Sequence, residues 1–270
     1  MRLSRRLIVA LLAVSALFAM PAVALAKSII TASGSTSVFP LSSALARKYV
    51  SLHRGQVGFR ILQGGSDVGI NDAAHGRVTI GDSSRDPLPS DPGGLVFNKI
   101  ARDGICVITN PSNPVGNLSQ QQVQAIFTGQ TRNWSDVPGA RVSGPIDLIS
   151  RTASSGTADA FQNIFLGQDL RVAPSAAAKQ SNGLVQQTVH SDANAVGFVS
   201  FDFIAGTHAA SYEGVPCTLR NAKSGQYQGV RNFWMVTRGP ARGAARSFIS
   251  WVQHNGTARK IISSHWISLH

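Results

Sequence analysis

The sequence predicts an α/β fold, and two observations support this prediction. Short apolar runs typical of strands alternate with helix-like stretches from residue 27 to the C-terminus, and Gly, Pro, Ser and Asp separate them. No internal repeat or low-complexity tract interrupts the alternation. The length fits one large domain or two domains of ordinary size.

Each expected strand or helix is a run of residues whose apolar positions fit that type of element. The expected strands are residues 28–33, 57–62, 78–83, 94–100, 104–110, 146–151, 195–201 and 232–238. The expected helices are residues 40–52, 67–74, 119–127, 157–166, 182–191 and 239–253. In the fourth helix, for example, Ala158, Phe161 and Phe165 recur at helical spacing and predict one buried face.

Two segments look like crossovers between lobes. The run NPSNPVGN at 110–117 contains two prolines, which force an extended chain that continues neither strand nor helix. A second crossover is expected between residues 206 and 217. We therefore expect lobe I to comprise residues 27–109 plus 207–270, and lobe II to comprise residues 110–206.

Residues 1–26 have the pattern of a secretory signal peptide, with three arginines, an apolar run and Ala24-Leu25-Ala26 before the expected cleavage point. We expect a periplasmic or secreted protein without a membrane span. No cysteine near the cleavage point could carry a lipid anchor. Removal of this segment leaves 22 basic residues against 13 acidic ones. That balance favours an anionic partner, but the charges are dispersed, so we expect no nucleic-acid binding.

The two cysteines, Cys106 and Cys217, lie in strand-like segments far apart in the sequence. Because an exported protein meets an oxidising environment, we expect them to form a disulfide. The alternative is a pair of buried, inert thiols.

Four turns share a composition of Gly with Ser or Thr at the start of a helix or the end of a strand. They are SGSTSVFP at 33–40, QGGSDVG at 63–69, GDSSRDP at 81–87 and RTASSGT at 151–157. Such turns supply hydroxyl and backbone N–H donors where the helix dipole is positive, which suits a tetrahedral oxyanion. Each turn alone could equally be an ordinary helix cap.

In these turns, in the ITNPSNPV run and in IFTGQTRNW at 126–134, the chain resembles the periplasmic phosphate-binding proteins of ABC importers, specifically their compact branch. The resemblance covers nearly all of the chain after residue 26. It implies a two-lobed periplasmic-binding-protein fold (type II-like), with mixed sheets flanked by helices and a ligand cleft between the lobes. It also implies inorganic phosphate and a membrane ABC importer as partners, without a cofactor or a metal. We expect a monomer.

Carried over residue by residue, the resemblance implies phosphate donors at Thr36, Ser37, Ser66, Arg151, Ser155, Gly156 and Thr157. Five neighbours in the same turns complete the candidate phosphate-binding set: Ser35, Asp67, Asp82, Ser84 and Arg85. The chain departs from the family at Ser84, where larger members have an aspartate that accepts the proton of phosphate. Asp67 and Asp82 are the candidate replacements, although either could merely cap a helix. A sulfate or molybdate binder is therefore an alternative.

Other function classes fit the sequence less well. An enzyme is not expected, because there is no Gly-x-Ser-x-Gly elbow, no His-x-x-x-His pair and no acidic cluster for paired metal ions. A secreted sensing or adhesion protein built on the same fold is the remaining alternative.

Overall fold

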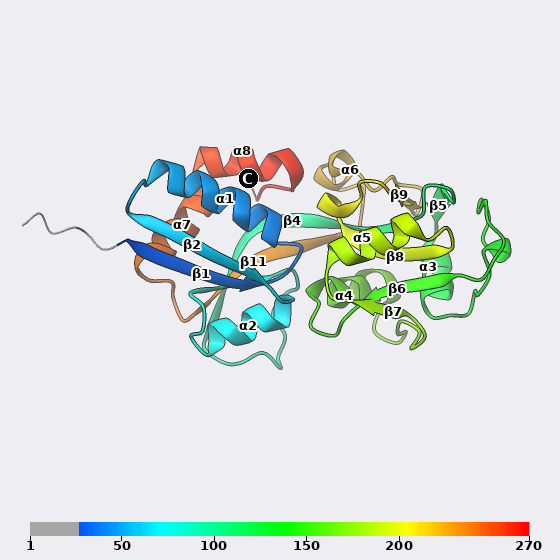
Figure 1. Ribbon diagram of the computed structural model, residues 1–270, viewed down its shortest axis with the longest axis horizontal. Helices are drawn as coiled ribbons and strands as arrows, with labels where there is room; N and C mark the ends of the chain where they lie inside the picture. The colour runs from blue at the N-terminus through cyan, green and yellow to red at the C-terminus, as the bar shows by residue number, and fades with distance from the viewer. Residues whose placement is uncertain (1–26, 270) are drawn as a thin grey trace, which may run out of the picture.

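The computed structural model describes residues 27–269, so the expected signal peptide lies outside the described residues. The fold is α/β, with two lobes side by side along the long axis of the molecule (Figure 1). Two strands in the middle of the molecule, β4 (Leu95–Thr109) and β11 (Val230–Arg238), connect the lobes. Within the described residues, none of the helices is both long and apolar enough to cross a membrane.

The first lobe combines the N-terminal and C-terminal parts of the chain. Its elements besides β4 and β11 are β1 (Ser28–Gly34), α1 (Phe39–Leu52), β2 (Val57–Gln63), α2 (Ser66–Ala74), β3 (Ile80–Ser83), α7 (Gly243–His254) and α8 (Gly256–His265). One hydrophobic core forms where α1, α7 and α8 pack on one face of the sheet. A smaller cluster forms where α2 packs on the other face, so side chains of β11 alternate between the two cores.

The second lobe is built from the middle of the chain. Its elements are β5 (Asn117–Leu118), α3 (Gln120–Phe127), η1 (Trp134–Asp136), β6 (Asp147–Arg151), α4 (Gly156–Phe161), η2 (Gln162–Leu166), β7 (Ala177–Lys179), α5 (Asn182–Ser191), β8 (Ala195–Ser200), η3 (Phe201–Phe203), β9 (His208–Ala209), β10 (Ser211–Tyr212) and α6 (Leu219–Lys223). An aromatic cluster fills its core, in which the rings of Phe161 and Phe198 stack with centroids 3.9 Å apart.

The sheet has the strand order β2-β1-β3-β11-β4-β8-β6-β7, and β9 also pairs with β4. The pairs of β1 with β2 and β3 are parallel, as are those of β6 with β7 and β8. The remaining pairs along this path are antiparallel, and β4 pairs with β11 in its first part and with β8 in its last. The sheet is thus mixed, as expected.

Two expected strands, 94–100 and 104–110, form the single strand β4. The polar Arg102-Asp103-Gly104 sequence resembles a turn, but Asp103 is buried at an ion pair with Arg231. Gly104 is required because a Cβ at this position would lie 2.0 Å from the ring of Phe201. Helix α8 was not expected, and α7 begins at Gly243 and not at residue 239.

The lobe boundaries follow from the packing. Tyr212, Cys217 and Tyr227 belong to the core of the second lobe, and β9 pairs with the end of β4. We propose that lobe II comprises residues 105–229, which moves residues 105–109 and 207–229 out of lobe I, where the sequence analysis placed them. The disulfide between Cys106 and Cys217 is confirmed, with the two Cα atoms 5.7 Å apart. It lies inside the lobe II of this proposed division.

Candidate functional site

The first hydroxyl-rich turn connects β1 to α1 and is held under the end of β3. Gly34 has φ +134°, and an added Cβ would lie 2.3 Å from the Asp82 carbonyl oxygen, so only glycine fits here. The Ser35 N–H donates to that same carbonyl at 2.8 Å. The turn thereby buries Ser35, Thr36 and Ser37 almost completely.

The second and third turns meet the first turn within lobe I. Ser66 begins α2, and Ser84 follows β3. The Ser35 hydroxyl donates to Ser84 Oγ at 2.8 Å. The Ser84 N–H donates to Ser66 Oγ at 3.0 Å, and the Ser66 and Ser84 hydroxyls are 3.3 Å apart. Three separate turns therefore present one row of buried hydroxyl groups.

The fourth turn comes from lobe II and closes onto this row. Ser155 is the N-cap of α4, because its side chain accepts a hydrogen bond from the Ala158 N–H at 3.3 Å. Gly156 faces lobe I so closely that an added Cβ would lie 2.3 Å from Ser66 Oγ. The Thr157 and Ser37 hydroxyls are 3.0 Å apart. The turn is thus both a helix cap and a contact between the lobes.

Arg151, at the end of β6, is buried with 5% of its surface exposed. Its Nε donates to the Lys179 carbonyl at 3.1 Å, and one terminal nitrogen, Nη2, donates to the Gln180 carbonyl at 3.0 Å and to Thr36 Oγ1 at 3.2 Å. The other terminal nitrogen, Nη1, is buried without a hydrogen-bond partner. Burial, together with the nearby charge of Arg231, lowers the pKa of Arg151 to about 9.

Arg231 was not identified from the sequence. It lies near the start of β11, 5% exposed, and forms an ion pair with the fully buried Asp103 at 2.9 Å. Its terminal nitrogens also donate to Thr157 Oγ1 and to Ser37 Oγ, each at 2.8 Å. Burial lowers the pKa of Arg231 and raises that of Asp103, and their ion pair opposes both shifts. Arg231 therefore links the strand between the lobes to hydroxyl groups of both lobes.

Asn182, at the start of α5, is the second residue that the sequence did not reveal. Its side-chain amide donates to Thr36 Oγ1 at 2.9 Å and to Ser37 Oγ at 2.8 Å. Its side-chain oxygen accepts a hydrogen bond from the Ser200 N–H at 3.1 Å. In the sequence it appears only as the residue after the Ser181 N-cap, which gives no signal of a site.

The structure does not bring the side chains of Asp67, Asp82 or Arg85 into the group of buried hydroxyl, amide and guanidinium donors described above. Arg85 forms ion pairs with Asp67 at 2.9 Å and with Asp91 at 2.6 Å, both in lobe I. It also lies 3.3 Å from the carboxylate of Asp159 on α4, which makes it an ionic contact between the lobes.

Asp82 is buried beside Ser42 of α1, and burial raises its pKa to about 7. Ser42 opposes this rise, but burial is the larger effect.

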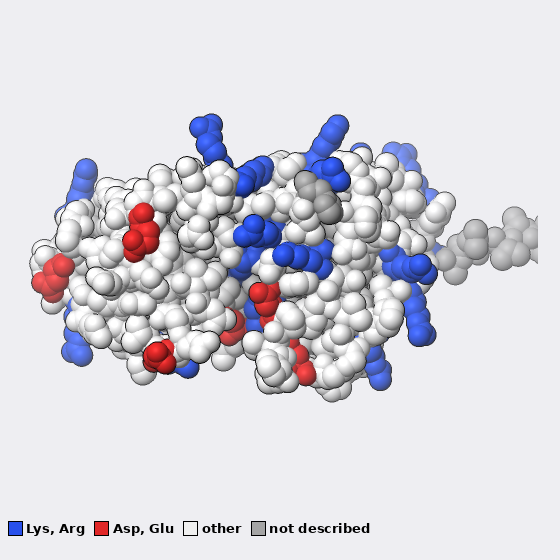
Figure 2. Space-filling model, turned by 180° about the vertical axis from the view of Figure 1, so that it is seen from behind, with Lys and Arg blue, Asp and Glu red and all other residues white. Residues whose placement is uncertain are grey.

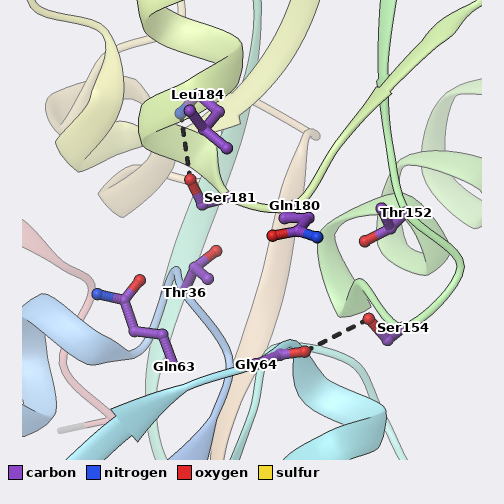
Figure 3. Close-up of a pocket in the computed structure, with 8 residues that line it drawn as sticks. All are labelled: Thr36, Gln63, Gly64, Thr152, Ser154, Gln180, Ser181 and Leu184. Carbon is purple, nitrogen blue, oxygen red and sulfur yellow. Dashed lines mark hydrogen bonds between the residues drawn. The ribbon is translucent and has the colours of Figure 1, made fainter.

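The buried hydroxyl groups of the four turns form what we call the hydroxyl cluster. An open groove lies next to this cluster, between the lobes (Figure 3). Its volume is about 400 Å³. It is lined by uncharged residues: Thr36, Gln63, Gly64, Thr152, Ser154, Gln180, Ser181 and Leu184. Thr36 is shared with the hydroxyl cluster, so the groove adjoins the buried donors.

Surface charge does not single out another site. Figure 2 shows Lys and Arg side chains scattered over one face, with a small group near the middle beside acidic side chains. Among residues 27–269, no group of three or more His, Cys, Asp and Glu side chains is placed to hold a metal ion. The chemical character of the candidate site is that of buried hydroxyl, amide and guanidinium donors, which suits an oxyanion.

Comparisons with known proteins agree with this character. A family model described as a PBP superfamily domain matches residues 21–255. The phosphate-binding protein PstS of Bacillus subtilis is 26% identical over 239 residues, which are 87% of this chain and 78% of that protein. Several further relatives in the curated set are also phosphate-binding proteins.

Solved structures extend the comparison. A phosphate ABC transporter substrate-binding protein from Clostridium perfringens, solved with bound phosphate, superposes with a TM-score of 0.84 at 31% identity and covers 90% of this chain and 100% of that chain. An ABC-type phosphate transport receptor from Vibrio cholerae gives a TM-score of 0.72 at 31% identity and covers 89% of this chain and 100% of that chain. The expected two-lobed binding-protein fold is confirmed.

Proposed function

This chain belongs to the PBP superfamily, and from that premise we propose that it is an exported solute-binding protein that captures inorganic phosphate between its lobes and delivers it to an ABC importer. The phosphate-binding relatives support the ligand and the importer. The donors gathered from the four turns, from α5 and from β11 support the position of the site. The proposed role is capture and delivery, without catalysis.

The observation that carries the proposal is the buried, unpaired guanidinium group of Arg151. Its guanidinium group is buried, has no carboxylate partner among the described residues, and keeps one terminal nitrogen free of hydrogen bonds. A buried, unpaired cation is unfavourable, and the lowered pKa of Arg151 reflects that cost. An anion bound between the lobes would supply the missing charge and the missing acceptor.

The geometry also fits capture by lobe closure. Thr36 and Ser37 come from lobe I, whereas Arg151, Thr157 and Asn182 come from lobe II, so the complete set exists only when the lobes meet. Closure removes water from charged hydrogen bonds, each of which contributes about 1.5–3 kcal/mol. We propose the uncharged groove beside Thr36 as the route by which the anion enters and leaves.

Isothermal titration calorimetry of the protein beginning at Lys27 tests the proposal. Bound ligand is first removed by partial unfolding and dialysis. Phosphate should then bind at a single site and raise the melting temperature, whereas sodium chloride at equal ionic strength should do neither, because screening alone does not fill the site. A stripped, folded protein that shows neither heat nor a thermal shift with phosphate would refute the proposal.

A further inference from the structure

The surface charge of this protein, which marks no second ligand site, is divided unevenly between the lobes. In the division proposed above, lobe I has 15 basic and 6 acidic residues, whereas lobe II has 7 of each. Charges that are dispersed along the sequence are therefore sorted by the fold. The net positive charge belongs to lobe I, and an anionic surface near the protein would attract that lobe.

The acidic residues of lobe I all lie between residues 67 and 103, in α2, β3, β4 and the loop that joins β3 to β4. They are Asp67, Asp72, Asp82, Asp86, Asp91 and Asp103. Helix α2 packs on the face of the sheet opposite to α1, α7 and α8 (Figure 1). Asp82 and Asp103 are buried. The acidic residues therefore do not neutralise the side of lobe I that the other three helices cover.

Helices α1, α7 and α8, which we call the helical layer, carry basic residues and no acidic ones. Residues 27–66 and 232–269 contain no Asp or Glu. Seven Lys and Arg side chains on these helices or at their ends are exposed or half-buried: Arg47, Lys48, Arg54, Arg242, Arg246, Arg259 and Lys260. At the end of lobe I, on the right in Figure 2, Lys and Arg side chains are visible without acidic neighbours.

The seven cations have no acidic partner within the part of the chain that the structure describes, because its ion pairs involve other residues. The layer meets a carboxylate at the C-terminal end of α8, where His265 lies 3.2 Å from Asp202 of lobe II. Like charges that lack counter-charges repel one another, and an anionic partner on this face would relieve that repulsion.

The packing of the helical layer holds its cations on the outside. The inner sides of the three helices bury apolar residues in the core of lobe I, so the charged side chains lie on the outer side. The rings of Tyr49 on α1 and Trp251 on α7 are in contact, with centroids 5.2 Å apart, which fixes these helices side by side. Trp251 is half-buried, and Leu52 at the end of α1 is 51% exposed. Cations beside exposed apolar side chains are typical of a surface that lies on a membrane.

We propose that the helical layer is a docking face for a membrane surface rich in anionic phospholipid headgroups. The cations are spread over three helices and not gathered in a cleft, which suits an extended sheet of small anionic groups. Charges of a single sign attract such a sheet in any rotation about its normal, whereas a partner protein is recognised through a pattern of both signs. If the proposed function is correct, this contact holds the protein beside the membrane that contains its importer.

The docking face and the proposed phosphate site are separate. The groove beside Thr36 is lined by uncharged residues, and none of the seven cations is among them. Docking therefore leaves the groove open, and phosphate affinity can serve as an independent check that a variant is folded. Failure of phosphate binding would refute the proposed function without deciding the docking, because the two are measured separately.

Co-sedimentation of the protein beginning at Lys27 with lipid vesicles tests the inference. One set of vesicles contains phosphatidylglycerol and phosphatidylcholine in equal parts, and the other contains phosphatidylcholine alone. We expect binding to the anionic vesicles only, and its loss when sodium chloride is raised from about 50 mM to about 500 mM, because salt screens exposed charges. No binding to anionic vesicles at low salt, or equal binding to both kinds, would overturn the inference.

A triple variant of the helical layer, with Arg246→Gln, Arg259→Gln and Lys260→Gln, locates the contact. Each Lys or Arg near an anionic membrane strengthens binding about fivefold, so loss of three should lower the vesicle partition coefficient about 30- to 100-fold. Phosphate affinity should stay unchanged, which shows that the variant is folded. If the variant does not fold, the wild-type vesicle measurements decide.

The matched control removes the same charge from exposed arginines of lobe II, by Arg132→Gln, Arg141→Gln and Arg220→Gln. We expect this control to change the partition coefficient less than about threefold. Equal losses in both triple variants would show that net charge and not the helical layer drives binding, and would overturn the inference. Binding of duplex DNA by the wild type without binding to anionic vesicles would also overturn it, because the face would then recognise a polyanion and not a membrane.

Discussion

Substitution of Arg151 by lysine is the sharpest perturbation of the proposed phosphate site. The Arg151 guanidinium is anchored on the Lys179 and Gln180 carbonyls and on Thr36, while Nη1 stays free. Lysine keeps the charge but has a single terminal nitrogen, which cannot hold these anchors and also reach an anion. Loss of one charged hydrogen bond of about 1.5–3 kcal/mol predicts a phosphate Kd about 10- to 150-fold higher.

The assay is calorimetric titration of stripped protein, with Arg77→Lys as the matched control. Arg77 pairs with Asp72 at 3.4 Å, and 58% of its side chain is exposed, so its replacement should leave the phosphate Kd unchanged. Arg151→Lys should also lower ligand-free stability, because its hydrogen bonds to the backbone are lost, so the melting temperature alone is not the readout. A folded Arg151→Lys variant with a Kd within about twofold of wild type would contradict the reasoning.

Three further predictions concern residues outside the hydroxyl cluster. Because burial raises the pKa of Asp82 to about 7, the unfolded chain loses this proton at a lower pH than the folded protein, and the cost to folding grows between the two pKa values and is complete above about pH 7. Asp82→Asn should therefore raise the free energy of unfolding in urea by up to roughly 4 kcal/mol at pH 8 and by much less at pH 5, and a difference that does not change with pH would contradict this. Replacing Cys106 and Cys217 by alanine should lower that free energy by about 2–5 kcal/mol, measured in urea, because the disulfide spans 111 residues; an unchanged midpoint would contradict this. Asp159→Asn removes the Arg85 contact between the lobes, so stopped-flow measurements at pH 7.5 should show phosphate dissociation about two- to fivefold faster. Burial and neighbouring carboxylates raise the pKa of Asp159 to about 6, so the phosphate dissociation rates of wild type and variant should converge as the pH falls below that value. Equal dissociation rates at pH 7.5 would show that the contact does not hold the lobes together.

The sequence by itself determined the α/β class, most strand and helix positions, the disulfide partners and the four hydroxyl-rich turns. These features depend on local patterns, namely the period of apolar residues, the capping residues and the glycines that permit tight turns. The Ser155 cap and the Gly34 turn, for example, can be recognised from a few residues of sequence. Local pattern also misled between residues 94 and 110, where two strands, 94–100 and 104–110, were expected and the structure has the single strand β4.

Only the tertiary structure decided which polar groups meet. Arg231 looks like the exposed start of a strand, but β11 crosses between the lobes and carries its side chain to hydroxyls 74 and 194 residues away along the chain. Asp67 and Arg85 stand in turns that match the site and yet pair with each other. A buried charge takes whichever partner satisfies it after the chain has folded, and that choice depends on long-range packing, which no local pattern encodes.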